Sequence, residues 1–233
     1  MRFFALCLFF LTLTAQTDPI LVPEVSQHEV EVRQGFTGTE LLLFGAILDP
    51  RGERGGDAYD IVVVLKGPTE AVTVREKQRV GGIWINAAST SFRSAPAFFA
   101  VASSRPIEDI VDKKTAMIYE LGLENIQYSP SGSINLDEQE RFRVGLIDLM
   151  GRNGFYKADM GGVKINEKVL YQARISLPSN VQTGNYTAET FAIANGRVVA
   201  SAIAEVEVKK VGFERLVEVF AHEASFLYGL LAV

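Results

Sequence analysis

The order of apolar and polar positions predicts a chain made mostly of β-strands. Residues 28–33 alternate, with Val30 and Val32 on one face and polar side chains on the other, as in a half-buried strand. Residues 40–48 and 61–65 are continuous apolar runs rich in branched side chains, which predicts strands covered on both faces. Further strands are expected at 70–80, 83–86, 98–102, 163–177, 185–194 and 198–208.

Two segments have helical spacing instead. The first follows Pro106 and ends at Gly122, with apolar residues at Ile107, Ile110, Val111, Met117, Ile118 and Leu121. The second is expected to be capped by Asn135 and to stop at Gly151. Asn195 and Gly196 form the strongest hairpin signal in the sequence.

Together these elements favour a mainly β fold. We predict an immunoglobulin-like antiparallel β-sandwich over residues 16–211, interrupted by a helical insertion at about 105–155. Only the architecture is meant, because the cysteine pair of antibody domains is missing.

Both ends of the chain point towards a membrane. Residues 1–15 combine Arg2, an apolar centre and a small-residue exit, as in a cleavable signal peptide, so we expect an exported protein. Residues 212–233 are predicted to form a C-terminal helix. Its last ten residues, 224–233, carry no charge and are about half of a membrane crossing. The alternative is an amphipathic helix folded onto the domain.

Composition narrows the classes of function. The 233 residues carry a net charge of −5 and no basic run, which argues against a nucleic-acid partner. The single cysteine, Cys7, lies in the predicted signal, so we expect no disulfide, thiolate metal site or cysteine nucleophile in the mature protein.

Candidate chemistry is sparse, and we predict no enzyme, cofactor or metal centre. The two histidines, His28 and His222, lie at opposite ends and are expected on solvated faces. The acidic turn at 49–60 could hold calcium loosely but lacks an EF-hand spacing. Trp84, with Phe92, Phe98 and Phe99, could line a groove, although core filling is favoured.

One polar segment could contact a ligand. Ser103, Ser104 and Arg105 precede a predicted helix start, where hydroxyl groups, a guanidinium and backbone N–H groups suit an anion.

Several passages resemble the alpha-proteobacterial transmembrane protein family, which has a signal, an extracytoplasmic domain and a C-terminal membrane helix. They are GFTGTELLLFGA (35–46), VVVLKGP (62–68), RVGGIWIN (79–86), FAVASSRP (99–106) and YGLLAV (228–233). The family's helix continues past the last passage, so residues 212–233 are expected to be a truncated transmembrane segment. The resemblance implies no catalytic residues, and it suggests a sulfite-exporter-type permease as a partner because their genes are neighbours.

Two functional hypotheses follow. The first is an accessory or interaction domain on the periplasmic side of the inner membrane, tethered there and in contact with a membrane transporter. The alternative is a small-ligand or anion-binding periplasmic module.

Overall fold

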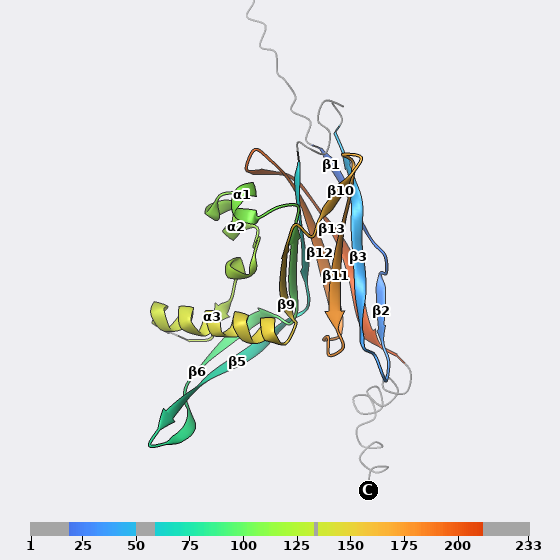
Figure 1. Ribbon diagram of the computed structural model, residues 1–233. Coiled ribbons are helices and arrows are strands. Elements are labelled where there is room, and N and C mark those ends of the chain that lie inside the picture. The colour runs from blue at the N-terminus through green and yellow to red at the C-terminus, as the bar shows by residue number, and fades with distance from the viewer. Residues whose placement is uncertain (1–18, 50–58, 133–134, 212–233) are drawn as a thin grey trace, which may run out of the picture.

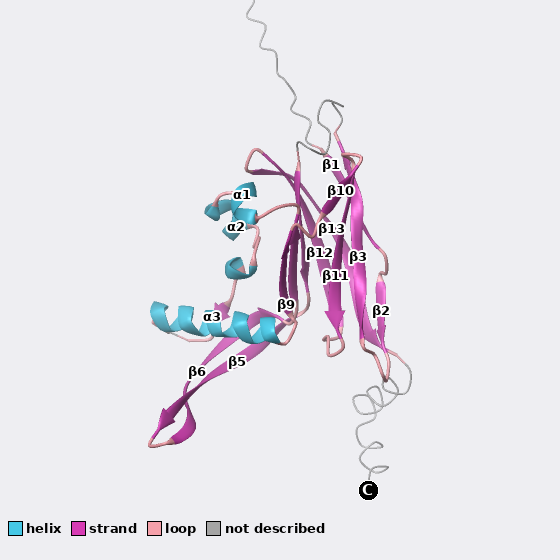
Figure 2. Ribbon diagram, in the orientation of Figure 1, coloured by secondary structure: helices cyan, strands magenta, loops and turns pink. Residues whose placement is uncertain are grey.

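The computed structural model describes residues 19–49, 59–132 and 135–211 (Figure 1). Its strands are β1 (Ile20–Val25), β2 (Glu29–Val32), β3 (Gly38–Leu48), β4 (Asp60–Lys66), β5 (Thr69–Val80), β6 (Ile83–Pro96), β7 (Phe99–Ser103), β8 (Ser129–Pro130), β9 (Tyr156–Met160), β10 (Lys164–Asn166), β11 (Leu170–Pro178), β12 (Gly184–Ala194) and β13 (Arg197–Lys210). Its helices are α1 (Ile107–Ile110), α2 (Lys113–Ile118), the 3-10 turn η2 (Leu123–Asn125) and α3 (Leu136–Arg152). The predicted mainly β class is confirmed (Figure 2).

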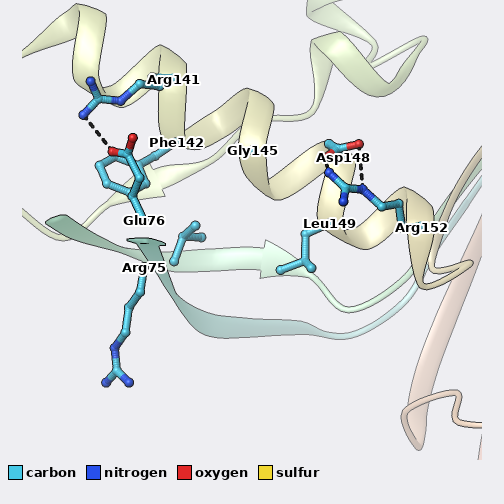
Figure 3. Close-up of a pocket in the computed structure, with 9 residues that line it drawn as sticks. Arg75, Glu76, Arg141, Phe142, Gly145, Asp148, Leu149 and Arg152 are labelled. Carbon is cyan, nitrogen blue, oxygen red and sulfur yellow. Dashed lines mark hydrogen bonds and ion pairs between the residues drawn. The ribbon is translucent and has the colours of Figure 1, made fainter. Parts of the chain in front are cut away.

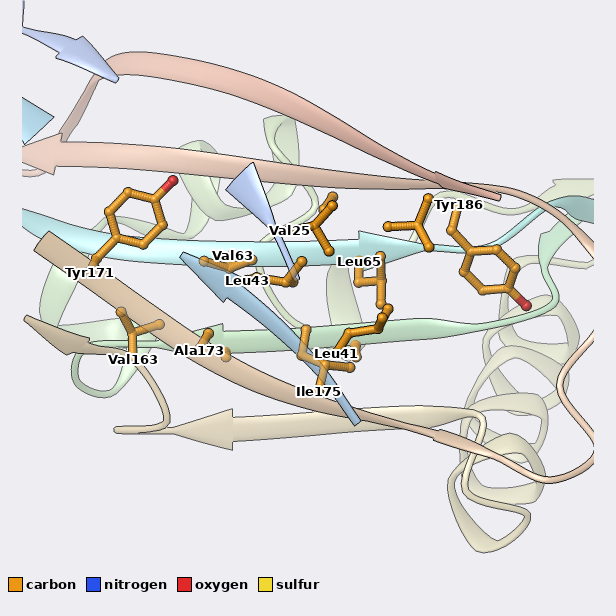
Figure 4. Close-up of a cluster of buried hydrophobic side chains, with 14 of the residues drawn as sticks. Val25, Leu41, Leu43, Val63, Leu65, Val163, Tyr171, Ala173, Ile175 and Tyr186 are labelled. Carbon is orange, nitrogen blue, oxygen red and sulfur yellow. The ribbon is translucent and has the colours of Figure 1, made fainter. Parts of the chain in front are cut away.

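Two sheets face each other and bury the main core between them. One has the strand order β1-β3-β11-β10 and the other β2-β13-β12-β4-β7-β9. Leu41, Leu43 and Ile175 of the first sheet pack with Val63 and Leu65 of the second (Figure 4). Each of these side chains alternates with residues on the opposite face of its strand, so the inward positions of both sheets form one apolar layer.

A second core lies on the other face of the six-stranded sheet. There Val62 and Val64 of β4 pack with Ile107, Ile110 and Leu121 from the helical region. Because β4 serves both cores, residues 61–65 are fully buried, which confirms the prediction of a strand covered on both faces.

The equivalent prediction for residues 40–48 is wrong. Burial in β3 alternates, and Phe44 and Leu48 remain 37% and 48% exposed. The outward side chains from Leu42 to Leu48 are apolar, but no described element packs over this face of the four-stranded sheet.

The chain passes between the two sheets near its start. β1 pairs with β3 in one sheet, whereas β2 pairs in parallel with β13 in the other. At the start of β12, the buried Tyr186 hydroxyl donates to the carbonyl of Gln182 at 2.7 Å. This resembles the tyrosine corner of immunoglobulin-type sandwiches and supports that type, which stays a prediction.

The first predicted helix is broken into short pieces. Val111 adopts an extended conformation, and the carboxylate of Asp112 accepts a hydrogen bond from the Thr115 N–H at 2.8 Å, so a new helix starts there. Met117 and Ile118 are therefore 53% and 63% exposed instead of buried. Apolar spacing alone could not reveal this competing cap.

The second predicted helix, α3, is confirmed. The Asn135 side chain accepts a hydrogen bond from the Asp137 N–H, and the helix ends at Arg152, one residue beyond the predicted stop.

Two hairpin turns divide the later strands. The predicted single strand at 163–177 is wrong, because Glu167 and Lys168 both adopt positive φ and reverse the chain between β10 and β11. The hairpin at Asn195 and Gly196 is confirmed, and both residues also have positive φ.

The third sheet, β5-β6-β8, is mainly one long hairpin, which we call the arm (residues 69–96). β5 and β6 are joined by Gly81 and Gly82, both with positive φ as in a type I′ turn. Figure 1 shows the arm extending from the sandwich, with α3 lying along its base. The sequence predicted only residues 83–86 of β6 as a strand.

The predicted signal peptide (1–15) and C-terminal helix (212–233) lie outside the described residues. Within the described part of the chain, every helix is too short or too polar to cross a bilayer.

Candidate functional site

The segment predicted to contact an anion is bound to a carboxylate of the same chain. Arg105 donates from Nε and Nη2 to the two carboxylate oxygens of Asp60, at 2.8 and 2.7 Å. Ser104 donates to Asp60 Oδ1 at 2.9 Å, and the buried Ser103 hydroxyl donates to the Arg105 carbonyl at 2.7 Å. Two of the three predicted residues, Ser104 and Arg105, therefore bind the Asp60 carboxylate.

The electrostatics of this cluster agree with its geometry. Partial burial acts to raise the pKa of Asp60, but the hydrogen bonds from Arg105 and Ser104 outweigh it and hold the pKa below its ordinary value. The same contact with Asp60 raises the pKa of Arg105. Anion binding at Ser103, Ser104 and Arg105 stays a prediction, which calorimetric titration with sulfite and sulfate would test.

The residues considered for acid–base or metal chemistry are dispersed. His28 is exposed, as predicted, with Nε2 2.9 Å from Glu24 Oε1, while His222 lies outside the described residues. In the acidic turn, Asp49 accepts a hydrogen bond from Tyr59 at 2.8 Å, and residues 50–58 are not described. Among the described residues, no three histidine, cysteine or acidic side chains are placed to share a metal ion.

The outer face of the four-stranded sheet is a continuous apolar patch, which we call the outer patch. The β1–β3 register places Ile20 opposite Leu48 and Val22 opposite Ala46, and the β3–β11 register places Leu170 beside Ala46. The exposed fractions of Ile20, Val22, Leu48 and Leu170 are 56%, 49%, 48% and 53%.

The outer patch ends abruptly along the sheet. Leu42 is its last large apolar side chain on β3, and Phe44 already has the polar residues Glu24 and Gln172 as its cross-strand neighbours. Two positions beyond Leu42, Glu40 Oε1 accepts a hydrogen bond from Arg174 Nη1 at 2.9 Å. An apolar area bordered on one side by polar groups is typical of a surface that a partner covers.

A groove of about 380 Å³ separates α3 from the arm (Figure 3). Gly145 leaves open space along the helix, and Phe142 forms part of the apolar wall. Its charged groups are largely paired, since Arg141 Nη2 lies 3.2 Å from Glu76 Oε2 and Arg152 binds Asp148. The side chains that line the groove therefore hold α3 beside the arm, and they do not present a reactive group.

The tip of the arm is the second exposed apolar area. Val80, Ile83, Trp84 and Ile85 surround the glycine turn, with exposed fractions of 55%, 69%, 65% and 45%. The prediction that Trp84 fills the core is therefore wrong, because the hairpin carries it beyond the sandwich. The prediction is correct for Phe98 and Phe99, which are fully buried in the two cores of the six-stranded sheet, whereas Phe92 is buried between the arm and α3.

A protein-family model described as "Putative transmembrane protein (Alph_Pro_TM)" matches residues 20–233. The chain belongs to this family. The match confirms the resemblance found in the sequence and associates the protein with a membrane. No curated protein matches the chain.

In this Alph_Pro_TM protein, the arm tip and part of the outer patch lie in segments that carry the family resemblance. Phe44 of the outer patch belongs to residues 35–46, and the whole arm tip belongs to residues 79–86. Neither was predicted as a site. The outer patch depends on cross-strand register, and the exposure of the tip depends on how far the hairpin extends.

Proposed function

We propose that this protein is an exported accessory domain, tethered on the periplasmic side of the inner membrane, that binds an integral membrane transporter. The partner that we favour is a permease of the sulfite-exporter type. The observation that carries the proposal is the outer patch. Strand β3 has the apolar composition of a strand buried on both faces, but only one of its faces is covered.

The energetics favour a partner for this face. An antiparallel sheet with one face in water normally alternates apolar and polar positions. The outward residues of β3 between Leu42 and Leu48 are all apolar, and β1 and β11 extend the same face with Ile20, Val22 and Leu170. Covering each large side chain would contribute about 1.5 to 3 kcal/mol at most, before the cost of association.

A protein partner suits the outer patch better than lipid. The patch lies on the broad face of a sheet, and the Glu40–Arg174 ion pair and Gln172 continue the same face. A complementary protein surface can cover the apolar part and satisfy the polar border in one contact.

Co-purification tests the contact. The full chain, expressed with the sulfite-exporter-type permease of its host, should be recovered with the permease from detergent extracts. Phe44→Arg should lower recovery at least tenfold, because a buried unpaired charge opposes association. Ile203→Arg is the matched control, since Ile203 is 57% exposed and lies on β13 in the opposite sheet. Failure of the wild type to bind, or equal recovery of Phe44→Arg, would reject this partner.

Fractionation tests the address and the tether independently. The mature protein should begin near residue 16 by mass spectrometry and should sediment with inner membranes. Cytosolic protein that retains Met1 would refute export, and purely soluble periplasmic protein would refute the tether.

A further inference from the structure

The arm has a supported base and an unsupported tip. At the base, Phe92 of β6 packs with Phe142 and Leu146 of α3, and all three side chains are buried. Beyond the register shift at Glu76 and Lys77, every residue from Lys77 to Asn86 is exposed. The structure therefore holds the arm in place while leaving its last turn bare.

The tip is apolar on both faces of the hairpin. Val80 pairs with Ile83, and the same face continues to Ile85, whereas Trp84 pairs with Arg79 on the opposite face. A Cβ added to Gly81 or Gly82 would have no atom within 4 Å, so the turn itself is also uncovered. Such a narrow apolar end could insert into a soft medium but offers little area for a flat protein interface.

The charged residues of the arm favour a membrane that contains anionic lipids. Arg75, Lys77 and Arg79 share the face of β5 that points away from α3, because Glu76 and its alternate neighbours face the helix. Residues 75–89 carry these three cations and one carboxylate, although the whole chain has a net charge of −5. Basic side chains behind an exposed tryptophan complement anionic lipid headgroups above an acyl core.

The position of the tip in the molecule is consistent with contact with a membrane surface. In Figure 1 the turn of the arm and the end of β13 both lie at the lower end of the molecule. From Val211, whose N–H donates to the Val32 carbonyl, the chain continues into residues 212–233, which the Alph_Pro_TM family model also covers.

We propose that the arm tip inserts Ile83, Trp84 and Ile85 into the interface of an anionic phospholipid bilayer, with Lys77 and Arg79 at the phosphates. This lipid contact goes beyond the proposed function, because it lies outside both the outer patch and the predicted tether.

Fluorescence tests the proposal directly, because Trp84 is the only tryptophan in the chain. The mature full chain is mixed with vesicles of phosphatidylglycerol and phosphatidylcholine, with and without brominated acyl chains. Insertion should shift the Trp84 emission to shorter wavelength, protect it from acrylamide and allow quenching by the brominated lipid. Because only Trp84 emits in this way, a predicted tether at 212–233 cannot produce these signals by itself.

Variants identify the contributing groups. The double variant Lys77→Gln, Arg79→Gln should lower the equilibrium constant for insertion of the tip into anionic vesicles by about 25-fold. Each lost charge accounts for about a fivefold decrease. Ile83→Ser with Ile85→Ser should lower it by at least tenfold. The matched control Ile203→Ser should leave quenching unchanged, and circular dichroism should show that every variant is folded.

Two outcomes would overturn the proposal. The first is a Trp84 that stays accessible to acrylamide on anionic vesicles. The second is protection only in native membranes, which would mean that the tip binds a protein. Loss of permease binding in Phe44→Arg with intact Trp84 quenching would separate the two surfaces, since lipid insertion does not depend on the outer patch.

Discussion

The carboxylate of Asp60 joins the start of β4 to side chains 44 and 45 residues later in the chain. Its bonds to Ser104 and Arg105 fix the segment that leads from β7 into α1. A role in holding the helical region on the sheet is therefore sufficient to explain why these polar residues are found together.

Replacing Asp60 should weaken the fold measurably. Asp60→Asn removes the negative charge that accepts three hydrogen bonds, and should lower the free energy of unfolding by about 1 to 3 kcal/mol in urea titrations. The control Glu40→Gln disrupts the exposed pair with Arg174 and should cost less than about 1 kcal/mol. Equal effects of the two changes would contradict this account.

The same carboxylate predicts a pH dependence. The folded-state pKa of Asp60 lies below its ordinary value of 3.8, so its stabilising effect is present above about pH 4 and is lost as the pH falls through the lowered pKa. The difference in unfolding free energy between wild type and Asp60→Asn should be constant from pH 7 to 5 and shrink below pH 4. A difference that grows with acidity would have the wrong sign.

At the scale of elements, the arm depends on one helix. Phe142 and Leu146 are the two α3 side chains that are buried, and both pack against the base of β5 and β6. The sequence predicted α3 correctly because its cap and its spacing agree. Nothing local to residues 135–152 identified the arm as the surface on which α3 packs.

Truncating this contact should loosen the arm selectively. Leu146→Ala should cost about 2 to 5 kcal/mol in the local stability of α3 and the arm base. Hydrogen exchange of their amides should accelerate, with little change in β12 and β13. Val144→Ala is the control, because Val144 is 53% exposed and should change exchange only slightly. Uniform acceleration across the sandwich would show that the arm is not a separate unit.

At the scale of the molecule, β4 couples the inter-sheet core to the core under α1 and α2. Leu65 belongs to the first core and Leu121 to the second, and both are fully buried. The two cores lie on opposite faces of one sheet, so disruption of either should be transmitted through β4 to the other.

A single cooperative transition should result. Leu65→Ala and Leu121→Ala should each lower the unfolding free energy by about 2 to 5 kcal/mol, with coincident transitions by far-ultraviolet and near-ultraviolet circular dichroism. A Leu121→Ala protein in which the helical region melts first would show that the second core is independent.

Local patterns by themselves determined much of this protein. The alternation at residues 28–33, the doubly covered strand at 61–65, the cap at Asn135 and the turn at Asn195 and Gly196 all act within a few residues, so they can be identified without knowing the fold. The same holds for the mainly β class, which follows from many such segments.

Tertiary structure decided where the surfaces lie. Leu48 and Trp84 both belong to apolar segments, and only strand pairing shows that one faces outward and the other lies beyond the core. Asp60 is a further example, because its ion pair with Arg105 joins two residues that are 45 positions apart in the sequence. Exposure and pairing depend on which distant segments meet, and a local pattern contains no information about that.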